Sequence, residues 1–211
     1  MDMKSIIIVG CGPGGLDCLT IAAQQEICQA KVLVGTARLL DSFPDVVAER
    51  LVIGCDIARG LDAMAARIET GPMVVLVTGD PGLCSLARPV IERFGRAACR
   101  VIPGISSLQA AFASIGEDWF GARILSAHHT TPDIDPASLA GDARLAILAG
   151  NPANAAWVDA LAQALLPTHE IFLCENLTLP DESIRHLHTL TLPMNPASRS
   201  ILLLIRKDLR Q

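Results

Sequence analysis

The sequence lacks tyrosine altogether, and aromatic residues make up only 3% of its 211 residues. Its core has to be built mainly from Leu, Ile, Val and Ala, because 51% of the residues are nevertheless hydrophobic. Aliphatic cores of this kind are typical of buried parallel strands and the helices that cover them. A chain of this length can bury roughly 70% of its unfolded surface, so we expect a sizeable packed core.

No long basic run is present, and the formal net charge is −5. The electrostatic footprint of a nucleic-acid-binding protein is therefore missing, and a membrane-surface role is disfavoured on the same ground. The apolar run before Gly10 is too short for a signal peptide, and ILLLI at 201–205 is too short to cross a bilayer. We therefore expect a cytoplasmic protein with no nucleic-acid partner and no membrane partner.

The seven cysteines include no C-x-x-C pair and no repeated spacing, and their number is odd. We interpret them as small, buried, reduced thiols rather than as a disulfide framework or a set of metal ligands. His186 and His188 could lie on one face of a strand, but no third ligand follows them. The sequence therefore predicts no metal site.

Strand-length apolar runs alternate with helix-length periodic segments in the first half of the chain. The runs cover 6–9, 32–34, 74–77 and 100–102, and the helical segments lie around 16–28, 57–70 and 83–94. This alternation predicts a parallel sheet covered by helices. The pattern breaks at GEDWFG, residues 116–121. We therefore predict an N-terminal α/β domain over 1–118 and a C-terminal α/β domain over 119–211.

The second half contains further strand-like stretches, of which the last two follow one another without a helix between them. These stretches cover 124–125, 145–148, 171–174, 184–192 and 200–205. Successive strands of this kind indicate an antiparallel edge. The predicted fold class is therefore two α/β domains, with a mostly parallel N-terminal sheet and a mixed C-terminal sheet.

The segment VGCGPGGLD, residues 9–17, has the glycine spacing of a dinucleotide-binding turn. A dinucleotide fold also needs an acidic residue at the end of its second strand, and that position holds Gly35. No lysine follows the glycines, so a Walker-type phosphate cradle is not supported either. Binding of NAD or FAD is consequently the weaker hypothesis.

Three further turns follow predicted strands and precede helical segments. In VTGDPGL we expect Asp80 to cap a helix that begins at Pro81, and Asn151 and Pro152 repeat this order in LAGNPANAA. In VIPGISSLQAA, Ser106 opens a capping box. Ligands of open α/β sheets bind beyond the carboxyl ends of the strands, so we expect these turns to surround one ligand.

The segments GCGPGGLDCLT, VGTARLLDSFP, VLVTGDPGLCSLA, VIPGISSLQAA and CENLTLPDESI, in this order and spacing, resemble the tetrapyrrole methylases. The similarity runs over nearly the whole chain and is greatest to the branch that methylates carbon 5 of precorrin-7 in cobalamin biosynthesis. The resemblance implies two α/β domains with S-adenosylmethionine, the methyl donor, in the cleft between them. It also implies a homodimer and a tetrapyrrole substrate, either precorrin-7 or cobalt-precorrin-7, which is converted to precorrin-8.

Residues that contact the cofactor are implied by the same motifs. They are Pro13, Gly79, Asp80, Leu83, Ser106, Ser107 and Leu148. The segment SAHHT keeps Ser126 and His128 of a related segment but has His129 and Thr130 where a glycine and a basic residue are usual. Ser126 and His128 are candidates for substrate contacts. Arginines near the turns could bind the carboxylates of the substrate, namely Arg38, Arg88 and Arg123.

The sequence identifies no general base. Alignment of a methyl donor with an electron-rich carbon can by itself supply about 7 to 11 kcal/mol, and we interpret Asp80 as a cap and cofactor ligand. Because the chain ends at Gln211, we expect a separate protein to methylate C(15) and decarboxylate the product. Three alternatives remain open: methylation at another tetrapyrrole position, a flavin- or NAD-dependent oxidoreductase, and a cofactor-binding scaffold without turnover.

Overall fold

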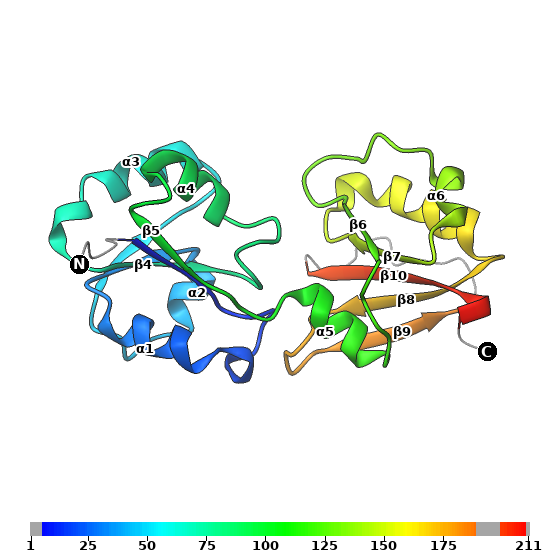
Figure 1. The fold of residues 1–211 in the computed structure, drawn as a ribbon, viewed down its shortest axis with the longest axis horizontal. Coiled ribbons are helices and arrows are strands. Elements are labelled where there is room, and N and C mark those ends of the chain that lie inside the picture. The colour runs from blue at the N-terminus through cyan, green and yellow to red at the C-terminus, as the bar shows by residue number, and fades with distance from the viewer. Residues whose placement is uncertain (1–5, 189–198, 210–211) are drawn as a thin grey trace. The chain divides into compact units, whose positions relative to one another are not determined.

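The computed structural model describes residues 6–188 and 199–209, and the chain forms two compact units, Met1–Ser106 and Ser107–Gln211 (Figure 1). Each unit contains a five-stranded sheet. The division falls before the helix α5 (Ser107–Ser114), whereas the boundary expected at residue 118 falls after it. α5 packs against β10 (Ser200–Arg206) of the second unit, which is why its contacts belong there.

The sheet of the first unit is entirely parallel, as predicted, with the strand order β3-β2-β4-β1-β5. Its strands are β1 (Ile6–Gly10), β2 (Val32–Gly35), β3 (Glu49–Val52), β4 (Met73–Val77) and β5 (Cys99–Ile102). Its helices are α1 (Ile21–Gln29), α2 (Ala37–Asp41), α3 (Ile57–Ala65) and α4 (Ala87–Phe94), with 3-10 turns at Leu16–Cys18 and Ile68–Thr70.

Both faces of the sheet are buried at the central strands β1, β2 and β4. Ile6 and Ile8 of β1 pack on the side of α3 and α4, and Ile7 and Val9 pack on the side of α1 and α2. Figure 1 shows these two helix pairs on opposite faces of the sheet. The chain thus leaves the adjacent strands β1 and β4 toward opposite faces, and in α/β sheets such a divergence marks the ligand-binding end.

The sheet of the second unit is mixed, as predicted, with the strand order β6-β7-β10-β8-β9. Its strands are β6 (Arg123–Ser126), β7 (Arg144–Leu148), β8 (His169–Glu175), β9 (Ser183–Leu187) and β10. Apart from α5, its helices are α6 (Ala155–Leu165) and 3-10 turns at Pro136–Gly141, Pro152–Asn154 and Lys207–Leu209. β9 is the expected antiparallel edge, but β10 lies at the centre, antiparallel to β7 and β8. Residues 189–192 of the predicted strand lie outside the described residues.

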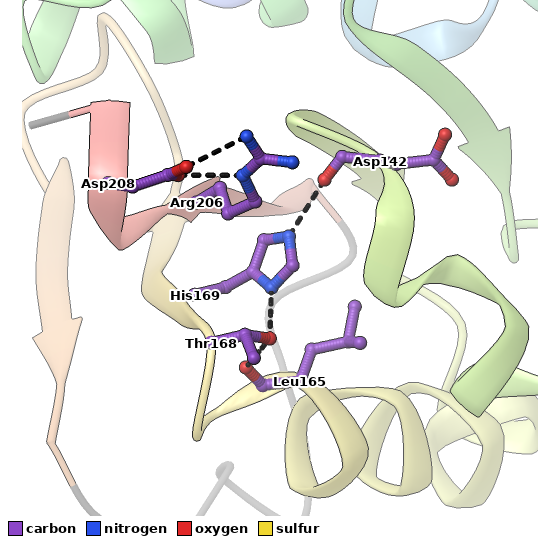
Figure 2. A network of polar contacts seen from close by, with 6 residues as sticks. All are labelled: Asp142, Leu165, Thr168, His169, Arg206 and Asp208. Atoms are coloured by element: carbon purple, nitrogen blue, oxygen red, sulfur yellow. Dashed lines mark hydrogen bonds and ion pairs between the residues drawn. The ribbon is translucent and has the colours of Figure 1, made fainter.

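Polar contacts of the buried His169 fix the start of β8 (Figure 2). His169 is fully buried, its Nε2 lies 2.8 Å from the carbonyl oxygen of Asp142, and its Nδ1 lies 2.8 Å from the Thr168 hydroxyl. A carbonyl oxygen only accepts hydrogen bonds, so His169 Nε2 is the donor in that contact. The Thr168 hydroxyl also lies 3.2 Å from the carbonyl oxygen of Leu165, at the end of α6. The imidazole therefore ties β8 to the segment that precedes β7.

The cysteines differ from the expectation in one respect. All seven are free, but Cys28, Cys55 and Cys84 are exposed, and three others are buried: Cys11, Cys99 and Cys174.

Two of the predicted helical segments, 16–28 and 83–94, are helical only in part. In each of them the second half forms a helix, α1 or α4, whereas the first half forms turns. Within 6–188 and 199–209, no helix combines the length and apolarity that crossing a bilayer requires.

Candidate functional site

Three glycines bring the ends of the neighbouring strands β4, β1 and β5 into contact. A Cβ on Gly10 would lie 2.6 Å from the Gly104 nitrogen, and a Cβ on Gly104 would lie 2.5 Å from the Gly79 carbonyl oxygen. Real side chains do not fit at such distances. The close approach of the three loops therefore depends on glycine, and the sequence shows it only as three separate G-containing turns.

The opening glycine turn pairs with the loop after β4. Gly12 and Gly79 both have positive φ and exchange two backbone hydrogen bonds, of 3.3 Å and 2.7 Å. Pro13, which follows, is buried. The turn leads into a 3-10 turn, and α1 begins only at Ile21, with Thr20 as its cap. A dinucleotide turn opens directly into its helix, so this geometry, with Gly35 at the end of β2, disagrees with NAD or FAD binding.

Asp80 does not cap a helix, and the prediction that Pro81 begins one is wrong. α4 starts at Ala87, after a series of turns. The Asp80 carboxylate instead accepts two backbone hydrogen bonds, from Gly82 N at 2.7 Å and from Gly104 N at 3.1 Å. The first bond is local, and the second reaches the loop after β5, so a contact across the sheet is added to a turn that no helix follows directly.

Arg38 approaches the same loop from the other side. Its Nη2 donates to the Thr78 hydroxyl at 3.0 Å, and Thr78 precedes Gly79 directly. Arg38 lies on the short helix α2, which follows β2, the neighbour of β4. Sequence reasoning selected Arg38 but not Thr78, because a single exposed threonine at a strand end carries no pattern.

The remaining predicted cofactor residues of the first unit lie on the same loops. Leu83 donates its backbone N–H to the Asp80 carbonyl oxygen at 3.1 Å, in the turns after β4. Ser106 is 7% exposed and directly precedes α5, whose first residue is Ser107. The structure thus brings together the loops that carry Gly79, Asp80 and Ser106 through contacts at their glycines.

In the second unit, Ser126 and Leu148 are paired neighbours at the ends of β6 and β7. Asn151 caps the 3-10 turn that starts at Pro152, which confirms the predicted cap. The Asn151 side chain also donates to the His128 carbonyl oxygen at 2.8 Å. Buried Asn154, which sequence reasoning missed within an alanine-rich stretch, donates to the Ala127 carbonyl oxygen at 2.6 Å. The loop that carries His128 is therefore anchored by two asparagines.

His128 is an uncharged imidazole near neutral pH. Partial burial and the neighbouring His129, whose ring centroid lies 4.8 Å away, lower the pKa of His128 below its ordinary value of 6.5. A neutral imidazole donates or accepts single hydrogen bonds and provides no cation for a carboxylate.

Arg88 and Arg123 were the other arginines considered for the carboxylates of the substrate. Both form ion pairs within the chain, Arg88 with Glu92 at 2.8 Å and Arg123 with Asp142 at 3.1 Å.

Cys11 lies beside the glycine contact without being a nucleophile. Burial raises the pKa of its thiol to about 12, and its Sγ lies 3.7 Å from the Val9 carbonyl oxygen. The thiolate is the reactive form, so Cys11 stays inert at neutral pH. The chemistry that this end of the sheet offers is therefore binding by backbone groups, one carboxylate, one guanidinium and serine hydroxyls.

Known proteins are similar to this chain both in sequence and in fold. The family model for tetrapyrrole (corrin/porphyrin) methylases matches residues 5–191. The cobalt-precorrin-7 C(5)-methyltransferase of Salmonella typhimurium is 37% identical over 123 residues, which are 58% of this chain and 61% of that protein. A probable cobalt-precorrin-7 C(5)-methyltransferase of Methanocaldococcus jannaschii is 26% identical over 197 residues, with 85% and 87% coverage. The chain thus spans about three fifths of the Salmonella relative that it matches.

Solved structures have the same fold at low sequence identity. The precorrin-6Y methylase (cbiE) of Archaeoglobus fulgidus has a TM-score of 0.72 at 22% identity and covers 97% of this chain and 100% of its own. The uroporphyrin-III C-methyltransferase of Thermus thermophilus, in complex with S-adenosylhomocysteine, has a TM-score of 0.71 at 20% identity, with 95% and 91% coverage. Since the family model matches most of the sequence, the chain belongs to the tetrapyrrole (corrin/porphyrin) methylase family.

Proposed function

We propose that the chain is an S-adenosylmethionine-dependent C-methyltransferase that methylates carbon 5 of precorrin-7 or cobalt-precorrin-7. The observation that carries the proposal is the glycine contact between Gly10, Gly79 and Gly104, which brings three of the family's motifs together at one end of the first sheet. The names of the relatives from Salmonella and Methanocaldococcus support position 5 of the ring. A cytoplasmic homodimer working with a separate C(15)-methylating decarboxylase belongs to the same proposal.

The loops of the first unit fit the cofactor chemically. Glycines keep side chains away from the strand ends, so a ligand can approach the backbone itself. The buried Ser106 hydroxyl and backbone groups suit the amino-acid and ribose portions of S-adenosylmethionine. When bound, the cofactor supplies a methyl group on a sulfonium sulfur. In the first unit we assign direct contacts with it to Pro13, Gly79, Leu83 and Ser106. Asp80, also predicted from the sequence as a cofactor residue, contributes through its hydrogen bonds to these loops.

Methyl transfer of this kind places a modest demand on the protein. S-adenosylmethionine would supply the methyl group from its sulfonium sulfur, which would keep the electron pair, and the ring carbon that gains the methyl group would lose its proton to water, since no general base is identified. Since alignment can contribute about 7 to 11 kcal/mol, the main task of the protein is to hold the methyl donor and the ring carbon in the correct relative position.

The other residues predicted from the sequence keep their assignments in this proposal. Ser107 and Leu148 are predicted cofactor contacts, and Arg38, Ser126 and His128 are predicted substrate contacts.

The test is a methylation assay with the purified chain. We expect incubation with S-adenosylmethionine and precorrin-7 to add one methyl group, detected by mass spectrometry and located at carbon 5 by a ¹³C-labelled methyl. A parallel reaction with cobalt-precorrin-7 shows which form is used. Methylation at another carbon would contradict the assignment to position 5 and would support the alternative, a methyltransferase for another tetrapyrrole position. Failure to bind S-adenosylhomocysteine in calorimetry would overturn the enzyme assignment itself.

A further inference from the structure

We propose that Asp80 is a positioning residue, which locks the loop after β4 to the loop after β5 and thereby sets the shape of the cofactor site before any ligand arrives. This inference rests on the proposed function for the identity of the ligand. It differs from direct ligation, because Asp80 acts on the cofactor through Gly104. The carboxylate is a clamp between two loops that lie far apart in the sequence.

Both carboxylate oxygens of Asp80 are engaged by the backbone. Oδ1 accepts from Gly82 N at 2.7 Å, within its own loop, and Oδ2 accepts from Gly104 N at 3.1 Å, across β1. Hydrogen bonds from backbone N–H groups to a carboxylate are charge-assisted and stronger than bonds between neutral groups. Of the residues with similarly short side chains, only aspartate offers two acceptor oxygens; asparagine offers one.

The bond to Gly104 lies where the loops are already in closest contact. Gly104 N is the atom that a Cβ on Gly10 would approach to 2.6 Å, and Gly104 itself leaves no space next to Gly79. The glycines allow the approach, but they supply no directional attraction between the β4 and β5 loops. The carboxylate of Asp80 supplies it and fixes the position of the loop that leads to Ser106.

The turn is held from its other end as well. Thr78 accepts from Arg38 at 3.0 Å, so the residues from Thr78 to Asp80 are fixed by α2 on one side and by the β5 loop on the other. A base needs a carboxylate oxygen within hydrogen-bond reach of the substrate proton, whereas both oxygens of Asp80 are directed at backbone N–H groups. The two backbone bonds of Asp80 therefore favour a structural contribution to cofactor binding over proton transfer.

The test compares Asp80→Ala and Asp80→Asn with the wild-type chain. We expect the Kd for S-adenosylhomocysteine and the KM for S-adenosylmethionine to rise at least tenfold in Asp80→Ala. Asp80→Asn keeps the acceptor for Gly82 N and loses one bond, so its increase should be several-fold. The kcat at saturating S-adenosylmethionine should stay within about threefold in both, since the reacting groups are untouched. A fall of kcat by a hundredfold at unchanged KM would overturn the proposal in favour of a base.

Amide hydrogen exchange in the ligand-free protein separates a clamp from a ligand contact. We expect the Gly104 N–H to exchange at least tenfold faster in Asp80→Ala and Asp80→Asn than in the wild type. Unchanged exchange together with weakened binding would mean that Asp80 contacts the cofactor directly. Since this readout needs no ligand, it remains decisive even if the wild type binds no S-adenosylhomocysteine, which would overturn the proposed function instead.

Asp135→Ala is a matched control. Asp135 also accepts a backbone N–H two residues along, from Ala137 at 3.1 Å, but lies in the second unit. We expect this variant to lose a comparable local bond and to keep the wild-type Kd and the wild-type Gly104 exchange rate. An equal loss of affinity in Asp135→Ala would show that a local turn bond is enough to explain the effect, and would overturn the clamp.

Discussion

Gly104 shows how backbone contacts decide the architecture of the site at the residue scale. Introducing Gly104→Ala would place a Cβ 2.5 Å from the Gly79 carbonyl oxygen and 2.8 Å from the Gly10 carbonyl carbon. Both obstacles are backbone atoms, so the loops have to separate. We expect a loss of about 1–3 kcal/mol in the free energy of unfolding, measured by urea denaturation.

Gly54→Ala is the control for that substitution. Gly54 also lies in the first unit, and a Cβ there would meet nothing within 4 Å. Its effect on the free energy of unfolding should stay within about 0.5 kcal/mol. Equal stabilities of the two alanine variants would contradict the glycine contact.

Single residues also show where sequence reasoning stops. Asn151 was correctly predicted as a cap, because its hydrogen bond to Ala153 N is local and requires only the N-P-A order. Asp80 stands before Pro81 in the same way and makes the same kind of local bond, to Gly82 N, yet its Oδ2 also accepts from Gly104 N and no helix begins there. That partner is 24 positions away, so no local pattern contains the information that decides between the two outcomes.

At the scale of elements, the buried strands were predictable, whereas the edge strand β3 and the central position of β10 were not. β1, β2 and β4 are apolar throughout because both faces are covered. β3, with the sequence ERLV, is an edge strand with mostly exposed side chains and lacks that signal. β10 is as apolar as any buried strand, but its central place between β7 and β8 is set by tertiary pairing.

Packing of elements around His169 leads to a stability prediction. Its imidazole connects the start of β8 to the carbonyl oxygen of Asp142 and to Thr168 (Figure 2). His169→Phe keeps a ring of similar shape but removes the hydrogen bond that the Asp142 carbonyl oxygen accepts, and it leaves the Thr168 hydroxyl only its contact with the Leu165 carbonyl oxygen. We expect a loss of about 1–3 kcal/mol in the free energy of unfolding, measured by urea denaturation.

His186→Phe is the matched control in the same unit. His186 is exposed and stacks on Phe172 with a centroid distance of 4.5 Å, a contact that phenylalanine can retain. Its free energy of unfolding should change by less than about 0.5 kcal/mol. If His169→Phe were equally neutral, the network would contribute nothing to the stability of the second unit.

On the scale of the whole molecule, each unit has its own hydrophobic core and its own buried cysteines. Cys11 and Cys99 belong to the cores of the first unit, and Cys174 is buried in the second. Burial raises the pKa of Cys11 to about 12 and that of Cys174 to about 11. At pH 8 these thiols are almost entirely protonated, and only the opening of a unit exposes them as ordinary thiols.

Thiol labelling therefore follows the two units separately. In folded protein at pH 8, we expect Cys28, Cys55 and Cys84 to react first because they are exposed. A hundredfold excess of S-adenosylhomocysteine over its Kd should stabilise the folded form by about 2.7 kcal/mol. The labelling midpoint of Cys11 in urea should then rise, as read by mass spectrometry of the labelled peptides. An unshifted Cys11 midpoint at saturating ligand would contradict cofactor binding at the glycine contact, because opening of that unit would cost no more with the ligand than without it.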